Sequence, residues 1–511
     1  MKNPFLFIIG LVVICFFTCC IGDKIDDDYE VKDTNGTDLL SFALTTDQGL
    51  SFDSFLIDDS VVHVCVPNGN DLSRFSVHTR HNGTSYSLDG KELCNEYLDY
   101  SDFTKPHYIS VVSSDSVVKS RRINIYDLPV LVIETPDRQA ILSKTDKIEG
   151  CIITLISAMG IADSLGTASV EGRGNSTWNE PKKPYNIKFD SKQNVLGMGK
   201  SKHWVLLANA YWDRTQMHNA VAYKMARLTD YNWVQNGQYV ELILNGQHLG
   251  LYYLCEKIRV EGGRIDINIM EPSDTIENEM DGGYLLESAF TPGEREFQTD
   301  YFNKTHAGKP LYWLIKKPEE SLHPSQFSFI RDELNHFEKL LLTPDSLLAG
   351  RASEILDIES AINWMLVNEV AVNAETDNPS NLFLYRDKKG KLSFGPPWDF
   401  DAHTFGVYRT HQIFLLRDDF YFYWLLQDPL FVKRLKEKWI IYKDIWMTSI
   451  PPYIDNLYSQ IVRSALRNEQ MWPSWHAMYH YPDVDYNTLI VEMKAFFKEQ
   501  LDYVDSIITN L

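Results

Sequence analysis

The chain has 511 residues, of which 44% are hydrophobic and 13% aromatic, and this globular composition excludes a disordered or fibrous protein. The length exceeds one ordinary hydrophobic core, so two domains are expected. The 70 acidic residues outnumber the 49 basic ones and give a formal net charge of −21, which argues against a nucleic-acid binder because such proteins present a basic face to phosphates.

Residues 1–20 are typical of an export signal. A single Lys is followed by an apolar run that is too short to span a bilayer as a mature helix and suits a secretory signal. The placement of Cys19 and Cys20 resembles that of the lipid-bearing cysteine of bacterial lipoproteins, and residues 21–38 would form an acidic tether. We therefore expect an exported, membrane-anchored lipoprotein, periplasmic or at the cell surface, lipidated at Cys19 or Cys20. A plain signal peptide with incidental cysteines is the alternative.

Four further cysteines, Cys65, Cys94, Cys151 and Cys255, show no C-x-x-C pair and no His at metal spacing, which argues against a zinc site. An oxidising compartment permits a disulfide, and Cys65 with Cys94 is a possible pair within one small domain. Four buried free thiols are the alternative.

Residues 39–128 are predicted to form a small all-β domain. Short runs with alternating hydrophobicity are separated by Asn-Gly, Asp-Gly and Ser-Asp turns, and no helix-length amphipathic segment lies between them. This spacing favours an antiparallel sandwich of immunoglobulin-like type. The domain carries no cluster of catalytic residue types and suits a spacer or binding module.

Residues 129–511 mix strands and helices, so the fold class is predicted to be α+β. A hairpin over 240–254 is indicated by an Asn-Gly turn between two apolar runs. Apolar residues at steps of three and four predict helices, and nearly everything beyond residue 418 has a helical pattern. The expected strands lie at 129–135, 150–157, 167–174, 184–190 and 203–209, and the expected helices at 213–228, 327–341 and 358–370.

Residues 382–386 and 391–395 predict a second hairpin, joined by the four-residue loop "DKKG". In the simplest register Arg386 faces Lys391. The residues before the first strand and those after the second then meet at one end of the hairpin.

That end carries Asp377 and Asn381 on one side and Asp399 and Asp401 on the other. Carboxylate and amide oxygens are the ligands that Mg²⁺ or Mn²⁺ prefers, with bridging phosphates completing the coordination shell. The order of groups resembles that of protein kinases, in which a catalytic-loop Asp precedes a metal-binding Asn, a hairpin and an Asp-Phe-Gly motif. Here the loop Asp and Asn are four residues apart rather than five, and no His-Arg precedes the Asp.

Longer sequence motifs give a further resemblance to a kinase family. The strings "VEGRGNSTWNEPKKPYNIKF", "YVELILNGQHLGLYYLCEKIRVEGG", "GGYLLE" and "NPSNLFLYRDKKGKLSFGPPWDFDAHTFG" resemble the CotH kinase family in the same order, over about residues 129–511. The resemblance implies an atypical protein-kinase-like domain that binds ATP and a divalent metal and phosphorylates protein hydroxyls, on another protein or on itself. It also implies Asp377 as the catalytic-loop Asp, Asp399 as a metal ligand and Asn381 as the second metal ligand.

The resemblance further implies that Lys188, in "YNIKF", holds the nucleotide phosphates. Strand alternation requires Ile187 and Lys188 to face opposite ways. A surface lysine on an edge strand is the alternative, and Lys182 and Lys183 are nearby competitors.

The chain has no G-x-G-x-x-G motif before Lys188. "EGRGNST" is the candidate cover for the phosphates, with Arg173 adding charge, and a tight strand connection is the alternative. The acidic partner of the lysine stays unassigned between Glu256 and Glu287.

Two other function classes stay open. A glycoside hydrolase also uses paired carboxylates, but a strand lysine has no role in that chemistry. A non-catalytic surface protein would use the sandwich and an inactive kinase-like domain for adhesion or assembly, since an exported protein meets little ATP. Divalent-dependent nucleotide binding separates this class from the kinase, and sugar release from polysaccharide identifies the hydrolase.

Overall fold

The computed structural model describes most of the chain from residue 35 onwards. Cys19, Cys20 and Asn381 lie outside the described residues, and Asp377 is described by its backbone alone. Within the described part, no helix has both the length and the apolar character needed to cross a membrane. The described ranges are 35–94, 99–209, 212–289, 293–300, 312–318, 322–377, 382–402, 404–406, 413–418, 420–473 and 484–511.

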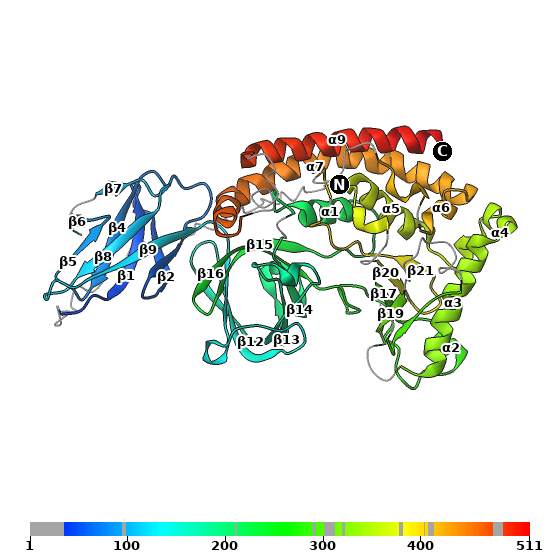
Figure 1. Ribbon diagram of the computed structural model, residues 1–511, viewed down its shortest axis with the longest axis horizontal. Helices are drawn as coiled ribbons and strands as arrows, with labels where there is room; N and C mark the ends of the chain where they lie inside the picture. Colours follow the sequence, from blue (N-terminus) through cyan, green and yellow to red (C-terminus); the bar gives the residue numbers. More distant parts are fainter. Residues whose placement is uncertain are drawn as a thin grey trace, which may run out of the picture.

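The fold is α+β, as predicted, and its first part is built of strands alone (Figure 1). Strand β2 pairs with both β1 and β3 and so joins two groups of strands in the order β6-β5-β8-β9-β3-β2-β1-β4-β7. Alternate side chains, among them Phe42, Leu44, Val64 and Val111, form its core. The strands are β1 (Leu39–Thr46), β2 (Ser51–Ile57), β3 (Val61–Cys65), β4 (Phe75–His81), β5 (Ser85–Leu88), β6 (Lys91–Leu93), β7 (Tyr100–Ser101), β8 (His107–Val112) and β9 (Val118–Tyr126).

The four cysteines beyond the signal are free thiols. The pairing of Cys65 with Cys94 that the sequence permits is therefore not formed. Cys65 is buried against Tyr126 and Val130, where this domain meets the next, whereas Cys94 is exposed. Burial raises the pKa of Cys65 to about 12, so this thiol stays protonated and acts as a small apolar side chain.

The second part is a closed seven-stranded barrel in the order β10-β11-β12-β13-β14-β16-β15. The barrel closes where β10 runs parallel to β15, while the neighbouring pairs are antiparallel. Ile153, Val170, Ile187 and Trp204 point inward and fill it. The predicted hairpin over 240–254 is confirmed. The strands are β10 (Val130–Glu134), β11 (Ile148–Ile156), β12 (Ala162–Gly172), β13 (Tyr185–Asn194), β14 (Lys200–Leu207), β15 (Gly237–Leu244) and β16 (Gln247–Glu256).

The third part is a five-stranded sheet in the order β18-β19-β17-β20-β21. Its last two strands are the predicted second hairpin, but Arg386 pairs with Leu392 and not with Lys391. The predicted register is wrong by one residue because the turn is longer: the Gly390 N–H bonds to the Asp387 carbonyl, and Lys389 adopts a left-handed conformation. The strands are β17 (Tyr284–Ala289), β18 (Glu296–Phe297), β19 (Tyr312–Lys317), β20 (Phe383–Arg386) and β21 (Leu392–Phe394).

Helices form a layer over the barrel and the five-stranded sheet, with α7 and α9 side by side along the top of Figure 1. The prediction of helices beyond residue 418 is confirmed. The first predicted helix begins at His218 rather than at 213, because the Asp213 carboxylate caps it by accepting the His218 N–H at 2.8 Å. The helices are α1 (His218–Arg227), α2 (Glu277–Met280), α3 (Pro324–Leu342), α4 (Pro344–Leu348), α5 (Ile358–Ala371), α6 (Phe422–Leu425), α7 (Pro429–Met471) and α9 (Tyr486–Asn510).

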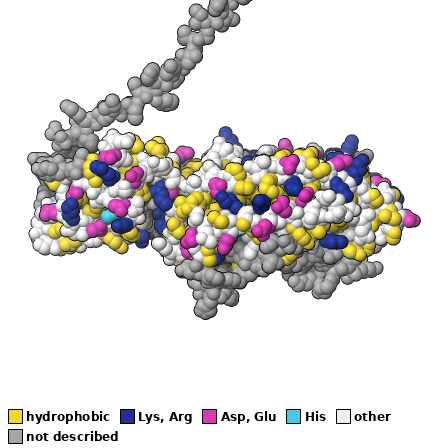
Figure 2. Space-filling view, turned by 90° about the horizontal axis from the view of Figure 1, so that it is seen from above, with side chains coloured by type: hydrophobic (Ala, Val, Ile, Leu, Met, Phe, Trp, Pro, Cys, Tyr) yellow, Lys and Arg dark blue, Asp and Glu magenta, His cyan; other side chains and the backbone are white. Residues whose placement is uncertain are grey.

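The outer surface of this helical layer is of mixed character. Figure 2 shows basic, acidic and hydrophobic side chains interspersed over its described part. Such a surface is what a solvated helix layer is expected to present, and neither sign of charge dominates it.

A buried polar network joins the N-terminal all-β domain, the barrel and α7 around Glu241 on β15. Its carboxylate accepts hydrogen bonds from Arg467 and, at 2.5 Å, from Ser464, and it lies 2.7 Å from His248. Ser464 also bonds to the buried carboxylate of Asp127, at the end of the sandwich, at 3.1 Å. Burial alone would raise the pKa of Glu241, but Arg467 and His248 outweigh it and hold that pKa low. The three parts are therefore held together by a buried, ionised glutamate.

Replacing Glu241 by Ala is expected to lower the free energy of unfolding by about 3–5 kcal/mol, because it leaves the Arg467 charge buried and unpaired. Denaturant titration of the full chain measures this loss. The double variant with Glu241→Gln and Arg467→Met should lose less, since neither charge then remains. As a control, Glu354→Ala breaks an exposed pair with Arg351 and should leave the midpoint unchanged. An equal loss in the single and double variants would contradict this account of the network.

Candidate functional site

An asparagine between α5 and η6 contacts the loop that follows the β20–β21 hairpin. Helix α5 leads into the short 3-10 helix η6 (Ala374–Asp377), which ends at the predicted catalytic-loop residue. Between them, the Asn373 side-chain amide donates to the Asn368 side-chain oxygen at 3.0 Å and to the Asp399 carbonyl at 3.4 Å. Asn373, four residues before Asp377, therefore contacts the backbone of Asp399; the relation between the two carboxyl groups stays a prediction, because the Asp377 side chain lies outside the described part.

Asp399 is half-buried and has a left-handed backbone conformation, with φ of 67°. Few residues other than glycine adopt this region, and Asp tolerates it better than most. Burial raises the pKa of Asp399, Arg173 and a hydrogen bond with Asp401 oppose that rise, and Glu287 adds to it. Several carboxylates thus crowd one place, and Arg173 supplies compensating positive charge.

The loop that follows Asp399 is fixed by buried side chains of α1. The Asn219 side-chain oxygen accepts the Phe400 N–H at 2.9 Å. The Thr404 hydroxyl donates to the Phe400 carbonyl at 2.6 Å and lies 2.9 Å from Nδ1 of His218. The other ring nitrogen of His218 lies 3.4 Å from Asp213. This chain of contacts holds both backbone groups of Phe400 and so limits how far Asp399 can move.

Arg173 follows β12 and is the predicted residue that the structure does bring to Asp399. Its guanidinium lies 5.3 Å from the centre of the Trp398 ring, a cation–π distance. On that ring packs Tyr223 of α1, with the two planes 19° apart and their centres separated by 6.2 Å. The aromatic stack explains how an arginine on the barrel is held beside the loop.

Lys188 lies on the outer face of the barrel, exposed, opposite Ser169 and His203 on the neighbouring strands. Ile187 points into the barrel core, so the predicted alternation is confirmed. The described contacts do not bring Lys188 to Asp399. Both nearby competitors are engaged elsewhere: Lys182 donates to the Ala208 carbonyl at 2.8 Å, and Lys183 donates to the Trp178 carbonyl at 2.6 Å.

The two candidate acidic partners differ in their surroundings. Glu256 is buried, accepts the Asn236 N–H at 2.9 Å and lies 3.5 Å from Arg264. Glu287 on β17 is half-buried, pairs with Lys316 at 2.8 Å, and acts electrostatically on Asp399. Glu287 is therefore the one of the two that belongs to the site.

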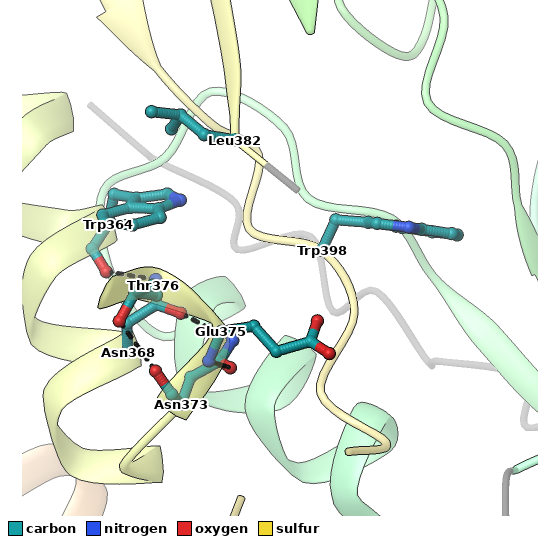
Figure 3. Close-up of a pocket in the computed structure, with 7 residues that line it drawn as sticks. All are labelled: Trp364, Asn368, Asn373, Glu375, Thr376, Leu382 and Trp398. Atoms are coloured by element: carbon teal, nitrogen blue, oxygen red, sulfur yellow. Dashed lines mark hydrogen bonds between the residues drawn. The ribbon is translucent and has the colours of Figure 1, made fainter. Parts of the chain in front are cut away.

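A small pocket adjoins η6 (Figure 3). Figure 3 shows Glu375 extending from η6 towards the segment that carries Trp398, with Trp364 and Leu382 on the opposite side. Sequence reasoning missed Glu375 because it attended to Asp377, two residues later. A second acidic residue near the end of α5 was the available signal.

The carboxylates suit a hard divalent cation only in part. Among the side chains that the structure describes, no three His, Cys, Asp or Glu residues are grouped so as to hold a metal ion. Asp399 and Asp401 offer oxygen ligands and already share a hydrogen bond. Such a pair fits Mg²⁺ or Mn²⁺ in the way that phosphate-bridging metals are usually bound, by one or two carboxylates plus phosphate oxygens.

A family model described as CotH kinase protein matches residues 170–504, more than half of the 511 residues. The chain belongs to the CotH kinase family. The resemblance seen in the motif strings is therefore confirmed. The match begins within β12 of the barrel and ends within α9, so it takes in Arg173, Asp377 and Asp399.

The other comparisons give no further information on the function of this CotH family member. No curated protein matches it. One solved structure, described as a candidate glycoside hydrolase from Bacteroides thetaiotaomicron, shares 12% identity over 55% of this chain and 67% of its own, with a TM-score of 0.16. That score is too low to support an argument about fold or function.

The Thr404 hydroxyl gives a direct test of how the Asp399 loop is held. Thr404→Val keeps the shape but removes both contacts of the hydroxyl, so hydrogen exchange at 399–405 should accelerate by about one to two orders of magnitude, as expected for a loss of about 1–3 kcal/mol. Thr404→Ser, the matched control, keeps the hydroxyl and should retain protection. Equal protection in the Val and Ser variants would show that the hydroxyl does not restrain the loop.

Proposed function

We propose that this CotH family chain is an atypical, ATP-dependent protein kinase that uses Mg²⁺ or Mn²⁺. The observation that carries the proposal is that Arg173 of the barrel acts on Asp399, so a cation suited to phosphate and a carboxylate suited to metal occupy one site. Phosphoryl transfer requires mainly positioning and charge neutralisation, and these residue types supply both.

In this proposal Asp399 and Asp401 hold the divalent ion, with Asn381 as a further ligand. The ion would bridge the phosphates and neutralise the charge that develops on them. Arg173 neutralises phosphate oxygens from the barrel side, and Lys188 was assigned the same task by resemblance. Asp377 orients the acceptor hydroxyl and takes its proton as the new oxygen–phosphorus bond forms and ADP departs.

The remaining features of the proposal follow from the sequence and the family. The acceptor is a hydroxyl on another protein or on the chain itself. The barrel and the helical layer act as the two lobes of a kinase-like domain, and the all-β domain is an immunoglobulin-like spacer. Lipidation at Cys19 or Cys20 would anchor the exported protein to a membrane, with no role for nucleic acid.

Asp377→Asn is expected to lower phosphorylation turnover by about 10²–10⁴-fold while nucleotide affinity stays within a few-fold of wild type, since only the proton acceptor is lost. Asp399→Asn should weaken metal-dependent nucleotide binding as well as turnover. Labelled ATP with Mg²⁺ or Mn²⁺ and a calorimetric binding assay measure the two quantities. Asp444→Asn, an exposed position on α7, is the control. Wild-type behaviour of both site variants would refute these roles.

Metal binding should depend on pH in a direction set by Asp399. Burial raises the pKa of Asp399, so protons compete with the cation up to a higher pH than for an ordinary carboxyl of pKa near about 4. Arg173 favours the carboxylate, so Arg173→Met should raise this pKa further and move the loss of Mn²⁺ affinity to a higher pH. Arg173→Lys keeps the charge and should move it less. Mn²⁺ titrations between about pH 4 and 8 measure the shift, and identical profiles for wild type and Arg173→Met would contradict it.

A further inference from the structure

A cluster of basic side chains lies on the outside of the barrel and beside it, in a chain whose net charge is −21. Unlike the mixed surface of the helical layer, these side chains act electrostatically on one another or on a shared neighbour. They come from the end of β12, from β13, from the segment after β16 and from β19. The members are Arg173, Lys188, Lys257, Arg259 and Lys316.

Lys257 lies at the centre of this cluster and is half-buried. Its ammonium group is 3.4 Å from the side-chain oxygen of Asn186 on β13, and the Asn186 amide donates to Glu171 of β12 at 3.1 Å. Lys257 is therefore held against the outer face of β12 and β13, close to where Arg173 leaves the barrel.

Register places Lys257 nearer than Lys188 to the site. Gly172, which precedes Arg173, pairs with Tyr185, and Asn186 is the next residue of β13. Lys188 is three residues beyond Tyr185, which is about 10 Å along a strand. The residue that Lys257 contacts, Asn186, is thus next to the strand pair that precedes Arg173, whereas Lys188 lies further along β13. Of the two lysines, Lys257 is therefore the one on the Asp399 side of the barrel.

The carboxylates described beside the cluster are already paired. Glu287 pairs with Lys316, itself a member of the cluster, and Glu261 pairs with Lys192 at 2.7 Å and accepts a hydrogen bond from Ser201 at 2.7 Å. Glu171 is the described carboxylate that acts favourably on Lys257.

The effect appears in the pKa values of Lys257 and of His203, which lies on β14 beside the cluster. Burial, together with Arg173, Lys316 and Arg259, lowers the pKa of Lys257 to about 8. Burial, together with Arg259, Lys257 and Lys188, lowers the pKa of His203 to about 3. The positively charged forms of these side chains are therefore destabilised in the free protein, and a bound anion would stabilise them.

We propose that Arg173 and Lys257 are the direct ligands of the nucleotide's phosphate chain, with Lys257 taking the place that the motif comparison gave to Lys188. The identity of the ligand as a nucleotide rests on the proposed function. The anion site itself rests on the cluster, on the contact with Asn186 and on the link through Arg173 to Asp399.

Binding should be coupled to proton uptake. Because the pKa of Lys257 is lowered to about 8, a fraction of the Lys257 side chains is neutral near that pH in the free protein, and a phosphate chain favours the charged ammonium form. The bound state therefore carries a higher pKa at Lys257, and binding takes up a fraction of a proton at that pH. Affinity should fall as the pH rises above about 8, because charging Lys257 then opposes binding.

Isothermal titration calorimetry of the full chain with inorganic tripolyphosphate, without metal, tests this site. Measurements at pH 8 in two buffers of different ionisation enthalpy give the number of protons taken up. We expect wild type to bind with fractional uptake, and Lys257→Met to bind at least about tenfold more weakly without uptake. Lys257→Arg is the sharper variant, since arginine keeps the charge but does not titrate: it should retain binding and lose the uptake.

Matched controls separate the two lysines. Lys188→Met removes an outlying charge of the cluster and should weaken binding less than Lys257→Met does. Lys200→Met, an exposed lysine at the start of β14 and outside the cluster, is the control and should not change the affinity. Wild-type affinity in Lys257→Met, full proton uptake in Lys257→Arg, or a larger loss in Lys188→Met than in Lys257→Met would each overturn the proposal.

Different experimental outcomes would reject the anion site and the kinase activity. Tripolyphosphate binding that depends on Lys257, with no phosphorylation of any acceptor, would keep the anion site and reject the kinase. Phosphorylation by wild type that persists unchanged in Lys257→Met, with unchanged tripolyphosphate affinity, would keep the kinase and reject the anion site.

Discussion

The electrostatic attraction between Arg173 and Asp399 is the interaction on which the site depends. It joins a strand end of the barrel to a loop more than two hundred residues later in the chain, and the stack of Tyr223 on Trp398 holds the guanidinium in place. This attraction matters for Asp399, whose carboxylate is crowded by other carboxylates and partly buried, because such a charge is stable only beside an opposite one. The rest of the described site is arranged around this pair.

Local patterns in the sequence were sufficient for most of the elements. The Asn245-Gly246 turn fixed one hairpin, and apolar steps of three and four fixed the long helices. Closure of the barrel could not be read locally, because it depends on a parallel pairing of β10 with β15 across more than a hundred residues. The register of the second hairpin was missed for a smaller reason: Lys389 takes a left-handed conformation that nothing in "DKKG" required.

The sequence indicated candidate site residues only where they lie in a recognisable motif. Asp399 was singled out because it follows the predicted hairpin, and Arg173 because it lies in the Gly-rich turn. For Lys188, the alternation of side chains along a strand predicts correctly that Lys188 and Ile187 face opposite ways. Alternation cannot predict which part of the outer face of the barrel lies beside Asp399. Lys257 follows a buried strand and lies within the family-like string that ends in "CEKIRVEGG", but the resemblance assigned no role to it. Lys257, Arg259 and Arg264, three basic residues within eight positions of an acidic chain, were the available signal.

The charges on the two sides of the site are complementary to a single kind of ligand. On the loop side the carboxylates are crowded, and the described side chains do not complete a metal site. On the barrel side the cations are crowded, and burial already weakens the charged state of Lys257. A metal ion alone would relieve only the first imbalance, and a phosphate chain alone only the second. A phosphate chain that carries its divalent ion would relieve both at once, and on this ground we propose a metal–nucleotide complex, rather than either component alone, as the ligand.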